Sequence, residues 1–264
     1  MRSTDHWPAS AGHRPRLPGA AALLVGVFTL VACTSHGLAT EPAAASASAA
    51  TGSVAQSLPR SAALLFSEAV VLSPAEARAL LDTLPVQGRA PKTGYARNQF
   101  GETWTDDVDV AGGHNGCDTR NDILGRDLID PAFKPGTRDC VVLSGTLGDP
   151  YTGKSIDFVR GQDTSHRVQI DHVVALSDAW QKGAQQLSPR ERANLANDPR
   201  NLLAVDGPAN QQKGASDAAS WLPPDKTYRC TYVAKQITVK SAYSLWVTQG
   251  EKDAMIRVLD GCTP

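Results

Sequence analysis

The sequence has no surplus of basic residues: 26 Lys and Arg stand against 27 Asp and Glu, and the formal net charge is -1. This balance excludes a globally basic binder of nucleic acid, so that any affinity for phosphate must come from a local patch. The chain also lacks the CxxC spacing of structural zinc sites and the GxSxG motif of serine hydrolases. It has no internal repeats. What remains is the composition of a soluble globular protein, with 41% hydrophobic and 20% charged residues.

An apolar run without charge covers residues 17–32 and follows a basic N-terminal segment. The run is too short and too rich in Gly and Ala for a membrane span, so we predict that residues 1–33 are an export signal. It ends in Leu30-Val31-Ala32-Cys33, which resembles the lipobox of bacterial lipoproteins. We therefore expect Cys33 to be lipidated; the alternative is an ordinary cleavage site nearby. The predicted location is extracellular or in the cell envelope, with any lipid anchor on the outer face of the cytoplasmic membrane.

Four further cysteines follow, and an even number in an exported chain predicts two disulfides. Three pairings are possible. We favour Cys117–Cys140 and Cys230–Cys262, because each joins nearby segments.

The rest of the chain divides by composition. Residues 34–60 are rich in Ala and Ser and are expected to form a disordered tether. Residues 61–92 form a helical lead-in, in which Ser73-Pro74-Ala75-Glu76 is typical of a helix start and Pro85 of a helix end. Residues 93–264 are the expected folded domain.

Within that domain, residues 141–147 and 155–159 predict a β-hairpin, and residues 168–174 and 201–205 predict two more strands. Helices are expected at 123–129, 177–183, from Ser188, at 207–214 and over most of 227–260.

Asp171 and His172 are adjacent near the end of the strand predicted at 168–174. Neighbours on a strand point to opposite faces, so a bulge or a strand end must aim both side chains at one site. Asn201 and then Asn210 and Lys213 follow downstream, the last two on an expected helix.

This order resembles the HNH (His-Me finger) nuclease motif. The wider pattern is more specific and is similar to the C-terminal HNH domain of GmrSD-type restriction endonucleases and their secreted relatives. The matching segments are 170–174, 178–180, 183–184, 197–198, 201–205, 210–214 and 228–232. The resemblance implies an α+β fold with a ββα-metal core, additional helices and a β-hairpin.

For the site, the resemblance implies that His172 is the general base for an attacking water, a task suited to an imidazole. Asp171 and Asn210 would bind a divalent metal through oxygen, most simply Mg²⁺ with Mn²⁺ as the alternative. Asn201 would support the strand and hold His172 through a hydrogen bond. Asn197 is the other candidate for this place, although it is easily a turn residue.

Two basic residues are candidates for contact with the substrate phosphate. Lys213 is either such a contact or a plain solvated charge. Arg120 either reads phosphate or pairs with Asp118 or Asp122 to hold a loop.

The resemblance implies an exported, metal-dependent endonuclease that hydrolyses phosphodiester bonds of DNA, with RNA as a further substrate. The expected partner is the nucleic acid, the protein is expected to be monomeric, and the membrane is contacted only through a lipid at Cys33. The alternative is a catalytically inert cell-envelope binding module that keeps the HNH scaffold, because a fold does not guarantee a function.

Overall fold

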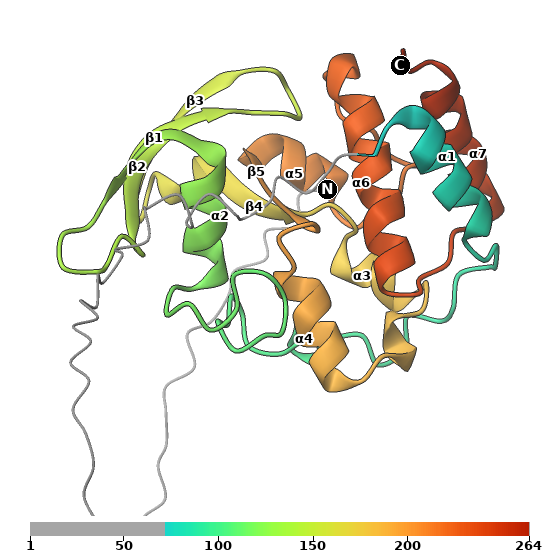
Figure 1. Cartoon of the computed structure of the whole chain (residues 1–264), viewed down its shortest axis with the longest axis horizontal. Coiled ribbons are helices and arrows are strands. Elements are labelled where there is room, and N and C mark those ends of the chain that lie inside the picture. Colours follow the sequence, from blue (N-terminus) through green and yellow to red (C-terminus); the bar gives the residue numbers. More distant parts are fainter. Residues whose placement is uncertain (1–71, 264) are drawn as a thin grey trace, which may run out of the picture. The chain divides into compact units, whose positions relative to one another are not determined.

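The computed structural model describes residues 72–263 (Figure 1). They belong to one compact unit, Gln56–Pro264. The predicted export signal with Cys33, the tether and the first part of the lead-in lie outside the described residues. No helix within residues 72–263 has both the length and the apolar character needed to cross a membrane.

The element that carries the site is two antiparallel strands followed directly by a helix. β4 (Val168–His172) pairs with β5 (Leu202–Asp206), with His172 opposite Leu202. α5 (Gly207–Lys213) begins at the residue after β5, where the Asp206 side chain accepts a hydrogen bond from the Ala209 amide. A Cβ at Gly207 would lie 2.3 Å from the His166 carbonyl oxygen, so glycine allows α5 to start this close to the segment just before β4. The α+β class and the expected ββα order are confirmed.

A second sheet has the order β1-β2-β3, with both pairs antiparallel. It consists of β1 (Leu128–Phe133), β2 (Val142–Gly148) and β3 (Ser155–Val159). The β2–β3 hairpin is the predicted one. The helix predicted over 123–129 is instead α2 (Thr119–Asp127), and the chain is extended from Leu128 onward. The prediction was wrong there because β1 is stabilised by pairing with β2, with Leu128 opposite Leu147, which no local pattern reveals.

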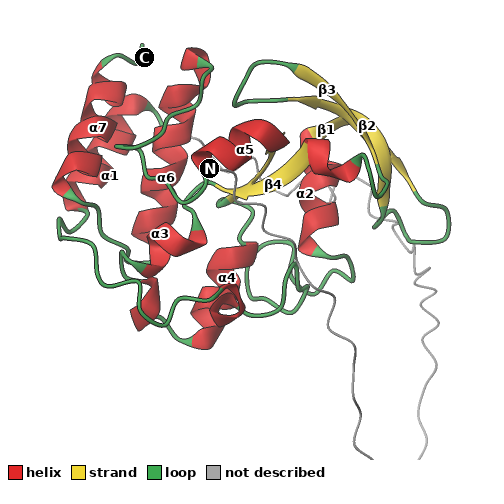
Figure 2. Cartoon of the chain, turned by 180° about the vertical axis from the view of Figure 1, so that it is seen from behind, coloured by secondary structure: helices red, strands yellow, loops and turns green. Residues whose placement is uncertain are grey.

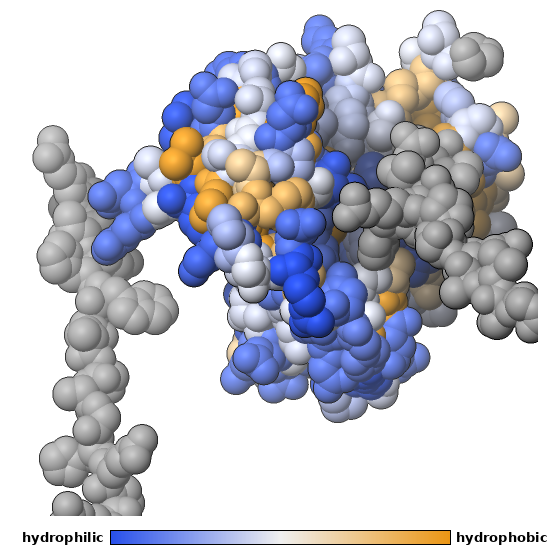
Figure 3. Space-filling view, turned by 60° about the vertical axis from the view of Figure 1, so that its left-hand side comes forward, coloured by the Kyte–Doolittle hydropathy of each residue, from blue (hydrophilic) through white to orange (hydrophobic). Residues whose placement is uncertain are grey.

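The outer surface of this sheet carries two exposed apolar side chains, Ile129 and Val159. In the space-filling view with this side of the molecule brought forward, apolar residues form a patch bordered by hydrophilic ones (Figure 3). The other surface packs on α2 and on the β4–β5 pair, and the core between them includes Ile123, Leu147 and Ile170.

Helices surround the β4–β5–α5 unit on its other sides (Figures 1 and 2). They are α1 (Pro74–Thr83), α3 (Leu176–Trp180), α4 (Pro189–Asn197), α6 (Arg229–Ala242) and α7 (Gln249–Asp260). α1 and α4 begin with the predicted capping boxes at Ser73 and Ser188. The helical region predicted over 227–260 is divided, because Ser244 has a positive φ of 51° and Val247 pairs with Val86.

A buried charge cluster joins α3, α6 and α7. Lys182 contacts Asp178, Asp217 and Glu251 at 2.6–2.8 Å, and Lys240 contacts Glu251 at 3.0 Å. Arg89 reaches two of these carboxylates from the chain after α1. Three cations therefore balance three anions in the interior, as buried charges require.

The structure contains both expected disulfides, Cys117–Cys140 and Cys230–Cys262. The first joins the loop before α2 to the β1–β2 connection. The second joins the start of α6 to the end of α7.

Candidate active site

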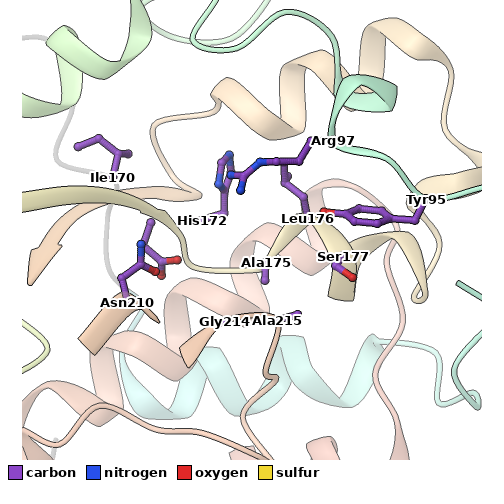
Figure 4. Close-up of a pocket in the computed structure, with 11 residues that line it drawn as sticks. Tyr95, Arg97, Ile170, His172, Ala175, Leu176, Ser177, Asn210, Gly214 and Ala215 are labelled. Atoms are coloured by element: carbon purple, nitrogen blue, oxygen red, sulfur yellow. The ribbon is translucent and has the colours of Figure 1, made fainter. Parts of the chain in front are cut away.

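A pocket of about 240 Å³ opens at the end of β4 (Figure 4). It is lined by Tyr95, Arg97, Ile170, Asp171, His172, Ala175, Leu176, Ser177, Asn210, Gly214 and Ala215. His172 is the last residue of β4, so the chain leaves the pleat there and both Asp171 and His172 contribute to the same pocket. Adjacent residues within a strand face opposite sides, and the end of β4 at His172 is what allows both residues to line one pocket.

The ring of His172 is held in one orientation and one tautomer. Its Nε2 lies 2.9 Å from the carbonyl oxygen of Ala196, in the last turn of α4. Because a carbonyl oxygen only accepts, Nε2 must carry the proton and donate it, and Nδ1 keeps its lone pair. The described residues give Nδ1 no hydrogen-bond partner.

Burial lowers the pKa of His172 to about 3, opposed by the bond to Ala196 and reinforced by the charges of Arg97 and Lys213. The imidazole is therefore neutral at pH 7 with an unprotonated Nδ1, and the same lowering makes it a weaker base than a free imidazole.

Trp104 covers the His172 ring. The two rings are stacked, with centroids 5.7 Å apart and planes at 11°. Trp104 has a positive φ of 59°, and its carbonyl accepts a hydrogen bond of 3.1 Å from the Thr119 amide at the start of α2. Sequence reasoning did not single out Trp104, because the contact joins residues 68 positions apart and leaves no local pattern.

Asp171 is buried and both of its carboxylate oxygens have partners. Lys213 donates to Oδ1 at 3.0 Å and to the His172 carbonyl at 2.8 Å, and the Tyr151 hydroxyl donates to Oδ2 at 2.5 Å. Asp149 positions Tyr151 by accepting hydrogen bonds within the turn before β3. Burial raises the pKa of Asp171, and the ammonium of Lys213 opposes that rise.

The structure agrees with neither role expected for Lys213, the phosphate contact or the solvated surface charge. Its side chain is fully buried rather than solvated, and its ammonium is used on Asp171 and His172 rather than open to a phosphate. The reason is that α5 packs directly on β4, which brings a residue 42 positions downstream onto the carboxylate.

Asn201 is completely buried, but its side chain does not bond to His172. Its Oδ1 accepts from the Val174 amide at 2.8 Å, and its Nδ2 donates to the Leu195 carbonyl at 3.1 Å. The expected direct hydrogen bond is therefore replaced by an indirect support. Asn201 fixes the chain just after β4 and the last turn of α4, where the Ala196 carbonyl accepts the hydrogen bond from His172 Nε2. Asn197 instead bonds to Ala193 within α4.

The structure places Asn210 in the pocket and Arg120 outside it. Asn210 donates its amide nitrogen to Gln169 at 3.0 Å, and within the described residues its amide oxygen has no partner. Arg120 donates to the Val168 carbonyl at 3.2 Å and is largely desolvated, which lowers its pKa. The structure thus brings together His172, Asp171 and Asn210, but not the two expected phosphate contacts.

Asp171 and Asn210 supply a carboxylate and an amide oxygen to the pocket. A carboxylate and a free amide oxygen fit Mg²⁺ in type, since this ion takes few protein ligands and keeps several waters. No group of three or more His, Cys, Asp or Glu residues is placed to hold a metal within residues 72–263. The ion pair with Lys213 also neutralises Asp171, so the pocket has little surplus negative charge to attract a cation by itself.

Comparison with known proteins gives a family and a relative. The family described as GmrSD restriction endonucleases, C-terminal domain, matches residues 118–258. An uncharacterized secreted protein from Arthroderma benhamiae (strain ATCC MYA-4681 / CBS 112371) is 37% identical over 192 residues, which is 72% of this chain and 86% of that protein. No solved structure matches. The matched range 118–258 contains β4, β5 and α5, and therefore Asp171, His172, Asn201 and Asn210.

Proposed function

Because this chain belongs to the family of GmrSD restriction endonuclease C-terminal domains, we propose that it is an exported, metal-dependent HNH endonuclease that hydrolyses phosphodiester bonds. DNA is the proposed substrate, with RNA as a further one. The observation that carries the proposal is the state of His172: Nε2–H is committed to Ala196, and Nδ1 remains as an unprotonated base in a pocket.

In the proposed reaction, His172 Nδ1 accepts a proton from a water that attacks the phosphorus. A new P–O bond forms as the bond to the leaving oxygen breaks, which gives a phosphate monoester at one end and, once the leaving oxygen takes a proton from solvent, a hydroxyl at the other. Proton transfer by a positioned side chain contributes roughly 10²–10⁴-fold to such a rate. Trp104 and the Ala196 carbonyl hold the ring, so that the lone pair does not have to be oriented during the reaction.

Asp171 and Asn210 would hold the divalent metal. That ion supplies positive charge to the phosphate and leaving oxygens when it is bound. Because Lys213 already offsets the charge of Asp171, we propose that the metal binds weakly alone and more tightly together with a phosphate.

Export is supported by the two disulfides and by the relative, which is described as secreted. We propose that the protein works outside the cytoplasm as a monomer, with lipidation of Cys33 as its link to the membrane.

The test is cleavage of plasmid DNA, single-stranded DNA and RNA by the purified, oxidised protein in Mg²⁺, Mn²⁺ or EDTA. We expect cleavage that needs metal, falls by about 100-fold or more in His172→Ala, and persists in His166→Ala. His166 is a matched control because it is an exposed histidine just before the same strand. Failure of the folded protein to cleave any of these substrates would contradict the proposal and favour an inert binding module.

A further inference from the structure

Arg97 lines the pocket beside His172. It is the first residue of the short helix η2 (Arg97–Phe100) and lines the cavity together with His172. Figure 4 shows its side chain extending from the loop toward the His172 ring. It stands outside residues 118–258, the range that matches the family.

The backbone beside Arg97 is anchored, whereas its guanidinium is not. Phe100 is buried and packs edge-on against Trp180, with ring centroids 6.2 Å apart. Arg192 donates to the Gln99 carbonyl at 2.7 Å, which ties η2 to α4. The side chain of Arg97 itself is exposed and makes neither an ion pair nor a hydrogen bond within residues 72–263.

The charges around it leave the pocket positive. Among the residues that line it, Asp171 is paired with Lys213, which leaves the guanidinium of Arg97 as the unpaired charge. By contrast, Arg89, Arg190 and Arg200 are each held by a carboxylate. An arginine without a counter-charge in a pocket beside a proton acceptor is the arrangement expected for an anionic ligand.

We propose that Arg97 binds the non-bridging oxygens of the substrate phosphodiester and places its phosphorus beside His172. The inference rests on the proposed function for its substrate and supplies the phosphate contact that neither Lys213 nor Arg120 provides. A guanidinium presents two parallel N–H donors that match two phosphate oxygens, so Arg97 fixes the orientation of the phosphate as well as its position. Because η2 is anchored, little backbone order has to be gained when the phosphate binds.

The experiment measures binding apart from cleavage. Wild type, Arg97→Gln, Arg97→Lys and Arg257→Gln are titrated against short fluorescein-labelled single-stranded and duplex DNA in EDTA at low salt, by fluorescence anisotropy. Arg257 is a matched control, since it is an exposed arginine on α7. Circular dichroism and thermal melting check that each variant is folded. The kcat and KM for cleavage are then measured in Mg²⁺.

We expect Arg97→Gln to weaken binding and lower kcat/KM by about 10- to 100-fold, the effect of a charge-assisted hydrogen-bond pair. Arg97→Lys should recover part of both, because it keeps the charge without the paired donors, and Arg257→Gln should stay within about twofold of wild type.

If Arg97→Gln and Arg257→Gln had equal DNA binding and equal kcat/KM, the inference would be overturned. The proposed nuclease function would still stand if the wild type cleaved DNA. DNA binding that depends on Arg97 without cleavage in any metal would support the inference and refute the proposed hydrolysis. A wild type that neither binds DNA in EDTA nor cleaves it in Mg²⁺ would overturn the inference.

Discussion

Replacing Lys213 by Met is expected to lower the free energy of unfolding by about 3–5 kcal/mol, because it leaves Asp171 as a buried carboxylate without its cation. The ammonium is fully buried, 3.0 Å from Asp171 Oδ1. At an effective dielectric constant of about 20, that separation corresponds to an attraction of about 5 kcal/mol, much of which offsets the cost of taking both charges out of water.

Urea denaturation of the oxidised protein measures the loss. The double variant Asp171→Asn/Lys213→Met is the control: it removes both charges and keeps the hydrogen bond from Tyr151, so it should recover most of the lost stability. If Lys213→Met alone stayed within about 1 kcal/mol of wild type, the buried ion pair would be refuted, and Lys213 would again be a candidate for phosphate contact.

Three further predictions concern the surroundings of the site. Trp104→Ala should lower kcat by about tenfold with little change in KM, and Trp104→Phe should restore most of it, because the stack orients His172 without touching substrate. Burial raises the pKa of Asp122 to about 6, so the protonated carboxyl is favoured in the fold, and this stabilisation is lost as pH rises from about 4 to 6. Because the carboxyl is partly exposed and screened by solvent, urea titrations should show Asp122→Asn gaining only about 1 kcal/mol of stability on wild type over that range. A difference between the two proteins that does not change with pH would contradict this. Replacing Cys230 and Cys262 by Ser should cost about 3–4 kcal/mol of unfolding free energy, as expected for opening a loop of 32 residues, and an unchanged Tm would contradict this.

The features that sequence predicted well are those set by neighbouring residues. The helix starts at Ser73 and Ser188 follow from capping boxes that lie within four residues. The β2–β3 hairpin follows from two apolar segments on either side of a turn that contains Pro150 and Gly153. The order of Asp171, His172 and Asn210 predicted the ββα unit through a family resemblance, which the comparison then confirmed as membership.

The features that sequence missed depend on contacts between distant residues. β1 needs its partner β2: Pro131 argues against a continued helix but does not by itself indicate a strand. The packing of α5 on β4 determines that the Lys213 side chain is buried against Asp171. Arg97 reaches the pocket from a segment 75 residues before His172. The sequence alone does not distinguish these two basic residues. Their surroundings in the fold show that Lys213 is the counter-ion of a buried carboxylate, whereas Arg97 has a guanidinium open to the pocket.

The central claim is that His172 acts as the general base, and chemical rescue tests it most directly. In His172→Gly, single-turnover cleavage of DNA in Mg²⁺ should fall by about 100-fold or more, and added imidazole should restore part of the rate in a concentration-dependent way. If His172→Gly cleaved DNA at the wild-type rate without imidazole, that result would contradict the role of His172 as general base.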